Sequence, residues 1–469
     1  MVLRRTPLHA LHRYFHSAPH TASFSCFTSE KKITGGYMKS SKRIKALFFC
    51  LAVAESLCHA QTQPSQTSLN LTIENAVEKA LEGNRSLKQG QLTLAQKKRS
   101  SSLSWSSLIP SIRGNASLSN TFSDKDTPAA ISIGGSASVT LTPSLYTAIK
   151  GASLNYEQQK ISYETAVTQV ELNVRKLFYS LLFKQAQIEV LQSTADSAQK
   201  RYESNQTKFR SGTLAQMDVL NSQITWQNAK LSVESAKMSL ENDLATFKQL
   251  LGIPQETLIT LSGNLEDVLS IGTISIEGIE AHSANVESCE KQLEIAKNAL
   301  LATRFSAWGP SISASYNYTI RGDTKNGLKN TDYGTFSLSL SIPLDGYIPW
   351  TNGGQSIANQ KDAVANLEME LDNARMTQDI NIQSAIKKIE QTQDSIQLRK
   401  SSVTVAQQSY DMTLSAYNHG TRDLLTLQSA SDNLQNAKMN LLSDALNLIT
   451  AILDLENTLG VPFGTLSSY

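Results

Sequence analysis

The sequence contains one stretch twice, and this duplication decides the fold. Residues 417–462 read YNHGTRDLLTLQSASDNLQNAKMNLLSDALNLITAILDLENTLGVP, and residues 209–254 read FRSGTLAQMDVLNSQITWQNAKLSVESAKMSLENDLATFKQLLGIP. The two stretches align without a gap at an offset of 208 residues and share Gly-Thr, Gln-Asn-Ala-Lys and Leu-Gly-x-Pro. A match of this length at a fixed offset indicates a duplicated structural unit.

Each copy carries apolar residues at heptad spacing. In the second copy they are Leu427, Leu434, Leu441, Leu448 and Leu455; in the first they are Val219, Trp226, Val233, Leu240 and Phe247, with a second row of Met217, Ile224, Leu231 and Met238. Two apolar rows at this spacing are typical of coiled-coil packing. The residues upstream, 145–209 and 354–417, contain no proline and would form helices of about 100 Å. The sequence therefore predicts two long helical hairpins, 145–250 and 354–458; a globular helix bundle is the alternative that such lengths disfavour.

Apolar and polar residues alternate ahead of each helical hairpin. The alternation covers residues 110–143 and 310–343, each interrupted by a polar loop. Period-two alternation over about ten residues is typical of strands in membrane barrels, although a soluble β-meander with one wet face gives the same pattern. Four strands are too few to close alone. We therefore expect three chains to share one twelve-stranded barrel, which leaves no strand edge unpaired.

Two structural repeats follow from these patterns. The first covers residues 61–254 and the second residues 279–463. Each is expected to contain a short amphipathic helix, over 72–105 or 279–307, then a β-hairpin and a helical hairpin. Residues 255–278 connect the repeats, and residues 464–469 form a C-terminal tail. The predicted fold class is mainly α, with long antiparallel coiled-coil hairpins and four membrane-barrel strands per chain.

The first 60 residues have the pattern of a leader. Met38 is followed by basic residues, an apolar run and small residues at a cleavage position, which predicts a signal peptide over residues 38–60. Residues 1–37 lack this pattern and are interpreted as an upstream extension of the reading frame; a genuine N-terminal region is the alternative. Leu57 precedes Cys58 where a lipobox needs a small residue, so we favour a cleaved, non-acylated N-terminus. Beyond the leader, no stretch reaches ~18 consecutive apolar residues, so a membrane span would have to be made of strands.

Charge and residue counts exclude several functions. The whole chain has a net charge of +2, but beyond residue 60 it holds 34 Lys and Arg against 39 Asp and Glu. A mildly acidic chain argues against nucleic acid as a partner. Cys289, His282 and His419 are the only cysteine and histidines beyond the leader, and no phosphate loop, zinc-protease motif or nucleophile elbow is present. We therefore expect no metal, no cofactor and no enzymatic activity.

Glycine and threonine mark the turn of each helical hairpin. Gly212 and Gly420 can adopt the left-handed conformation that ends a helix. Thr213 and Thr421 are candidate N-caps for the returning helices. Asp423 lies near a helix N-terminus, where the helix dipole favours a negative charge. For glycine and threonine, a role as ordinary turn residues would be sufficient.

At these motifs the chain resembles the outer membrane factor family. The aromatic-x-x-Gly-Thr tip, the duplicated Leu-Gly-x-Pro end and the repeat layout carry the resemblance, which covers roughly residues 70–463. It implies a homotrimer in the outer-membrane lipid, with a shared barrel and a long periplasmic α-helical tunnel. It also implies that a periplasmic adaptor and an inner-membrane RND or ABC transporter dock at the tips, and that drugs or polypeptides leave through the duct. The expected docking residues are Gly212, Thr213, Gly420, Thr421 and Asp423.

The resemblance further implies a gate at the periplasmic tips. The residues that match the family's gating network are Asp218 in the first hairpin and Tyr417 and Arg422 in the second. It implies that Arg422 bridges to Asp218 and that the Tyr417 hydroxyl donates to the same carboxylate; ordinary surface residues are the alternative. The family's constriction carries a ring of Asp, whereas the matching positions here are Thr426 and Ser429. These two positions therefore do not support a cation-binding constriction; partial substitution by Asp423 is the alternative.

An export duct is not the sole function that such a chain can have. A surface-exposed trimeric coiled-coil protein, structural or adhesive, would also use long heptad helices as a stalk. Such a stalk has no need of barrel strands in both repeats. Conductance separates the two hypotheses, because an adhesin conducts nothing.

Overall fold

The structure is a computed structural model of the chain that describes residues 68–120, 128–265, 268 and 281–466. These residues belong to one compact unit. The leader predicted over residues 1–37 and 38–60 lies outside the described residues, as do residues 266–267 and 269–278 of the predicted connector.

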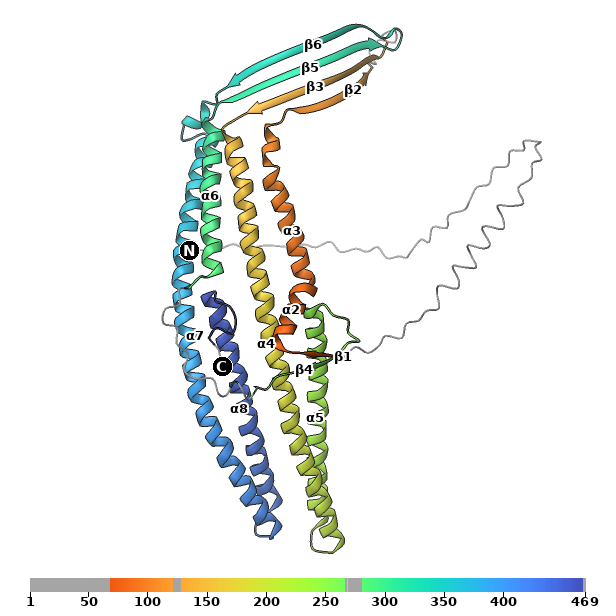
Figure 1. Ribbon diagram of the computed structural model, residues 1–469, viewed down its shortest axis with the longest axis vertical. Helices are drawn as coiled ribbons and strands as arrows, with labels where there is room; N and C mark the ends of the chain where they lie inside the picture. The colour runs from red at the N-terminus through yellow and green to blue at the C-terminus, as the bar shows by residue number, and fades with distance from the viewer. Residues whose placement is uncertain (1–67, 121–127, 266–267, 269–280, 467–469) are drawn as a thin grey trace, which may run out of the picture. The chain divides into compact units, whose positions relative to one another are not determined.

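Two long helical hairpins dominate the described unit. The first consists of α4 (Ser144–Arg210) and α5 (Gln216–Leu251), and the second of α7 (Asn352–Asn418) and α8 (Leu424–Leu459). Both long helices have 67 residues, which corresponds to about 100 Å. Figure 1 shows the two hairpins side by side with their tips at the same end. The hairpins predicted from the heptads are confirmed.

The short helices differ between the two repeats. The single helix predicted over 72–105 is wrong, because the structure has α2 (Ile73–Gly83) and α3 (Arg85–Ser102), followed by a 3₁₀ turn, η1 (Ser104–Leu108). Asn84 breaks the helix: its side chain accepts hydrogen bonds from the N–H groups of Ser86 and Leu87, and its Nδ2 donates to the Leu250 carbonyl at 3.1 Å. A cap for α3 and a tie to α5 thus stabilise the break.

In the second repeat the helix is continuous. It is α6 (Ala284–Trp308), which packs against α4 and α7. A short 3₁₀ turn, η3 (Asp345–Tyr347), precedes α7. The indole N–H of Trp308 donates to the Gly346 carbonyl at 2.6 Å and so ties the end of α6 to this turn.

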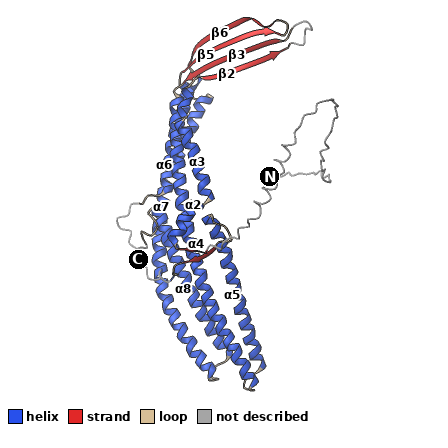
Figure 2. Cartoon of the chain, turned by 45° about the vertical axis from the view of Figure 1, so that its right-hand side comes forward, coloured by secondary structure: helices blue, strands red, loops and turns tan. Residues whose placement is uncertain are grey.

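Four antiparallel strands form a sheet at the other end of the helices from the hairpin tips (Figure 2). The strands are β2 (Ser111–Ser119), β3 (Ala130–Leu141), β5 (Ser311–Asp323) and β6 (Gly327–Ser341). Their order is β2-β3-β5-β6, so β3 and β5 join the hairpins of the two repeats. Both predicted β-hairpins are confirmed, and β2 and β6 are the edge strands.

The register places apolar residues of all four strands on one face of the sheet. One cross-strand row consists of Ile112, Ala137, Tyr316 and Phe336, and the row from the next residues consists of Ser111, Ser138, Ser315 and Ser337. Successive side chains point to opposite faces, so the second row lies on the polar face. Phe336 is 68% exposed, because no described part of the chain covers the apolar face.

A small parallel sheet joins the start of the first repeat to the region between the repeats. It consists of β1 (Ser68–Leu71) and β4 (Leu258–Leu261), with Ser68 opposite Leu258. The prediction of residues 255–278 as a plain connector missed this strand. Four residues carry too little pattern to indicate a strand whose partner lies so far along the chain.

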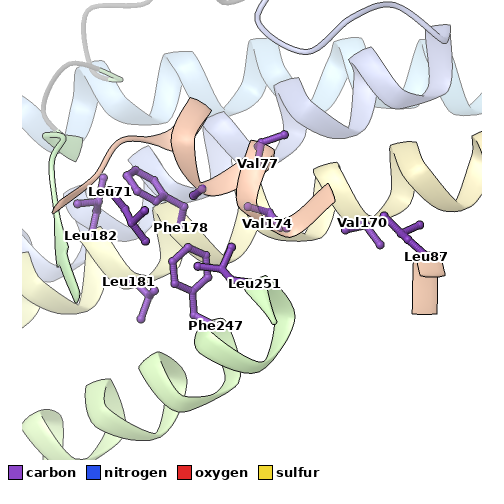
Figure 3. Close-up of a cluster of buried hydrophobic side chains, with 12 residues drawn as sticks. Leu71, Val77, Leu87, Val170, Val174, Phe178, Leu181, Leu182, Phe247 and Leu251 are labelled. Carbon is purple, nitrogen blue, oxygen red and sulfur yellow. The ribbon is translucent and has the colours of Figure 1, made fainter. Parts of the chain in front are cut away.

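The hydrophobic core lies where the short helices and the small sheet meet the long hairpins. Figure 3 shows its first cluster, in which Phe178 of α4 and Phe247 of α5 lie near Leu71 and Leu251. The rings of Phe178 and Phe247 are 6.4 Å apart between centroids. A second cluster joins α4 to α7 and α8.

The long helix α4 connects the two hairpins. Lys184 of α4 pairs with Asp243 of α5 at 2.7 Å, and Lys176 of α4 pairs with Asp454 of α8 at 2.5 Å. Because α4 also packs against α8, α4 and α8 lie in the middle and α5 and α7 lie on the flanks (Figure 1). Among the described helices, none has an apolar stretch long enough to cross a bilayer.

Candidate site at the helical hairpin tips

Glycine ends the first helix of each hairpin. Gly212 has φ +76° and Gly420 has φ +73°, so both adopt the left-handed conformation predicted for them. A Cβ at either position would meet no atom within 4 Å. The backbone angle, rather than lack of space, therefore favours glycine at both tips.

The threonines close the helix that precedes the turn. The N–H and the hydroxyl of Thr213 both donate to the Lys208 carbonyl at 2.9 Å, and those of Thr421 both donate to the Ala416 carbonyl at 2.9 Å. The prediction of Thr213 and Thr421 as N-caps is therefore wrong. After a left-handed glycine, the chain folds back onto the last turn of the first helix, and the hydroxyl reaches the unpaired carbonyl there.

The returning helices start differently in the two hairpins. The N-cap of α5 is Ala215, which makes no side-chain cap hydrogen bond. The N-cap of α8 is Asp423, whose Oδ1 accepts from the N–H of Thr426 at 3.0 Å and from the Thr426 hydroxyl. These hydrogen bonds lower the pKa of the Asp423 carboxyl. The predicted position of Asp423 at a helix N-terminus is confirmed.

Tyr417 lies in a partly buried seam between α4 and α7. Its hydroxyl donates to Oδ1 of Asn205 at 2.7 Å, and Nζ of Lys208 lies 5.2 Å from the centroid of its ring. Burial raises the pKa of the Tyr417 hydroxyl; the charge of Asp218 raises it further and that of Arg201 lowers it. In the single chain the hydroxyl thus donates to Asn205, and not to Asp218 as expected from the sequence. The reason is that Asn205 projects from the adjoining α4 into the same seam.

The charged gate residues lie near the tips without meeting in one chain. Asp218 is in the first turn of α5, and Arg422 is exposed in the turn between α7 and α8. Within the part of one chain that the structure describes, no hydrogen bond or ion pair joins Arg422 to Asp218. Each side chain is therefore available to a group outside the chain.

Sequence analysis missed two residues of this seam. Besides Asn205, Arg201 of α4 donates to the Tyr410 hydroxyl at 3.3 Å. Residues 201, 205 and 208 fall on one helix face, and Tyr410 and Tyr417 are seven residues apart on α7. This spacing was the available signal, but it does not identify the opposing helix.

The described residues contain no group of three His, Cys, Asp or Glu side chains that could hold a metal ion. Cys289 is buried, and burial together with nearby Glu370 raises the pKa of its thiol. A thiol held in the neutral form is a poor nucleophile.

Comparison with known proteins gives one family and several related channels. The model of the family described as "Outer membrane efflux protein" matches residues 76–253 and 276–461. Outer membrane protein TolC of Escherichia coli (strain K12) is 22% identical over 352 residues, which cover 71% of this chain and 70% of TolC.

Three solved outer-membrane proteins have the same fold. CmeC of Campylobacter jejuni matches with a TM-score of 0.69 at 18% identity, over 83% of this chain and 85% of CmeC. VceC of Vibrio cholerae matches with a TM-score of 0.67 at 13% identity, over 83% of this chain and 96% of VceC. The open state of MtrE of Neisseria gonorrhoeae matches with a TM-score of 0.64 at 17% identity, over 83% of this chain and 89% of MtrE.

Proposed function

We propose that this chain, which belongs to the outer membrane efflux protein family, forms its duct from three copies and closes it at the hairpin tips. The family resemblance predicted from the sequence is confirmed. The protein is an outer-membrane efflux channel that reaches into the periplasm, and it is a conduit rather than an enzyme. The adhesive alternative finds no support in these comparisons.

The sheet supports assembly into a barrel. Its edge strands β2 and β6 carry backbone groups that can pair with another chain, and its apolar face is exposed. Three copies would bring twelve strands together, so that β6 of one copy pairs with β2 of the next. The apolar face would then contact lipid and the Ser-rich face would line the lumen.

Exposed heptad rows on the flanking helices support the same assembly, and they are the observation that carries the proposal. On α5, four residues at seven-residue spacing are 55% to 68% exposed: Met217, Ile224, Leu231 and Met238. On α7, three residues at the same spacing are 62% to 74% exposed: Leu398, Val405 and Met412. Rows of this kind mark a packing surface. Because α5 and α7 lie on opposite flanks, the α5 row of one copy packs against the α7 row of the next.

This packing brings the charged tip residues of neighbouring copies together. Arg422 follows α7 in sequence, and Asp218 lies at the start of α5. Arg422 of one copy pairs with Asp218 of the next, which holds the tips closed. An exposed ion pair contributes roughly 0.2–1 kcal/mol, so docking of a partner at the tips is sufficient to release it.

The partners are a periplasmic adaptor and an inner-membrane RND or ABC transporter. The exposed turn residues Gly212, Thr213, Gly420, Thr421 and Asp423 form the docking surface. The wall of twelve helices presents these tips to the periplasm, where an adaptor can contact all of them.

Conductance in planar bilayers tests the gate. Arg422→Ser and Asp218→Ala should each raise the conductance of the purified trimer, because each removes one partner of the ion pair. The double variant Asp218→Arg/Arg422→Asp should return it toward the native value, since the pair is restored with reversed signs.

Arg210→Ser is the matched control, because Arg210 is an exposed arginine at the other tip. It should leave the conductance native. Native conductance in both single variants, or an equal rise with Arg210→Ser, would overturn the ion-pair gate.

A further inference from the structure

The seam between α4 and α7 contains a polar contact that the charged gate does not use. Asn205 of α4 accepts the hydroxyl hydrogen of Tyr417 of α7 at 2.7 Å. One turn before it, Arg201 donates to Tyr410 at 3.3 Å, and one turn after it, Lys208 lies over the Tyr417 ring. Three successive positions on one face of α4 thus contact α7 close to the tips.

Asn205 is the residue of this seam that water does not reach. Its side chain is completely buried, whereas Arg201 and Lys208 are partly exposed. A hydrogen bond with one fully buried partner loses more when it is broken than an exposed one does, because the buried group stays unpaired. The Asn205–Tyr417 bond is therefore the contact that matters most for holding α7 against α4 here.

The side-chain amide of Asn205 is also unfavourable if its role is only to fill space between α4 and α7. Nδ2 of Asn205 is buried and has no hydrogen-bond partner among the described residues. Exchanging the amide oxygen and nitrogen would not help, since one buried atom would still be unpaired. A leucine has the same branched side-chain shape and would bring no unpaired nitrogen into the site, although it is larger and gives the Tyr417 hydroxyl no acceptor. A buried polar group with one unpaired atom is expected at functional sites, where proteins depart from a fully satisfied core.

We propose that Asn205 is a positioning residue of the tip gate: it holds Tyr417 and the second hairpin against the first hairpin of the same chain in the closed state. The proposal rests on the proposed channel function, but it does not need the Asp218–Arg422 pair. The two contacts join different parts: the ion pair joins neighbouring copies, and Asn205 joins the two hairpins of one copy. The tip opens when α7 moves away from α4 and the Asn205–Tyr417 bond breaks.

The test is a double-mutant cycle on the purified full-length trimer in planar bilayers. Tyr417→Phe removes one oxygen atom, and Asn205→Leu removes the acceptor. Each should raise the open fraction about fivefold, the shift that the loss of one hydrogen bond produces. The double variant should be no more open than either single variant, because both remove the same bond. Asn205→Ala serves as a second variant if the leucine prevents assembly.

Thr392→Val is the matched control. Thr392 is also buried on α7, but its hydroxyl donates within its own helix, to the Lys388 carbonyl at 2.7 Å. It should leave the open fraction native. It should also leave the open fraction of Asn205→Leu unchanged, whereas a general loosening of the helices would make Thr392→Val raise the open fraction as well.

The outcomes separate the two proposals. If trimeric Asn205 variants stay native while Tyr417→Phe opens the channel, or if the double variant opens it additively, the role of Asn205 is overturned and the gate stands. If the Asn205 and Tyr417 variants open the channel while the Asp218 and Arg422 variants do not, the ion-pair gate is overturned and the role of Asn205 stands.

Discussion

At the scale of single residues, Glu456 shows how a buried charge serves this chain. It is 0% exposed near the end of α8, and its Oε1 accepts from the N–H groups of Gly464 at 3.0 Å and Leu466 at 2.8 Å. Burial raises the pKa of the Glu456 carboxyl; the two N–H groups and Arg175 lower it, and Glu171 raises it. The side chain therefore holds the segment after α8 against the helix, at the cost of a desolvated carboxylate.

This balance predicts a pH dependence for stability. The pKa of Glu456 is 4.5 in the unfolded chain and higher in the folded protein. Between these two pH values, Glu456 is protonated in the folded protein and ionised in the unfolded chain. The contribution of Glu456 to stability is thus present at low pH and lost as pH rises through the pKa of the folded protein. Glu456→Gln keeps the acceptor oxygen without the charge. Its unfolding temperature, followed by circular dichroism of the detergent-solubilised trimer, should fall less with rising pH than that of the native protein; parallel profiles would contradict this role.

At the scale of elements, one helix uses its two heptad rows for different partners. On α5, the row that contains Val233 and Phe247 is buried within the chain, at 2% and 0% exposure. The row that contains Leu231 and Met238 is exposed. The sequence predicts coiled-coil packing from both rows but does not show which row is buried within the chain and which is exposed. The division follows from α4, which covers one face of α5 and leaves the other exposed, as the proposed packing of copies requires.

Leu231→Lys should therefore prevent trimer formation while the single chain still folds. Burying an unpaired ammonium in the interface costs several kcal/mol in each of three copies. Ser232→Lys is the control, because Ser232 is exposed about 100° further round the helix and its hydroxyl bonds only its own helix. Light scattering on the detergent-solubilised proteins should give a monomer for the first variant and a trimer for the second. A trimer from both would place the interface elsewhere.

At the scale of the whole molecule, tertiary contacts join the two repeats into one unit. The strands β3 and β5 join the two β-hairpins into one sheet, and α4 joins the two helical hairpins. The sheet presents one apolar and one Ser-rich face, so neighbouring residues of a strand have opposite environments in the proposed barrel.

Leu338 and Ser337 of β6 make this contrast testable. An arginine on the lipid face of a barrel costs about 2–4 kcal/mol at the bilayer midplane, whereas the lumen accepts one. Leu338→Arg should reduce the amount of folded trimer in the outer-membrane fraction, and Ser337→Arg should insert as the native protein does. Insertion of both to the same extent would show that the two faces are not divided between lipid and water.

The sequence was informative wherever a short pattern repeats. The hairpins, the four-stranded pattern and the left-handed glycines follow from spacing and residue type, and all are found in the structure. It failed where one side chain had a distant partner. Asn84 breaks a helix by binding Leu250, and Thr213 bonds a carbonyl behind it rather than the helix ahead. Local pattern cannot show which of two possible hydrogen bonds a side chain will make.

By itself, then, the sequence determined the duplication, the type and length of the main elements, and the family. These depend on periodicity, which is a local property of the chain. Tertiary structure decided which helix faces are covered, that β1 pairs with β4, and that Tyr417 donates to Asn205. Those choices depend on which buried groups meet across the fold. A buried donor must find its acceptor in space, at whatever distance along the chain that acceptor lies.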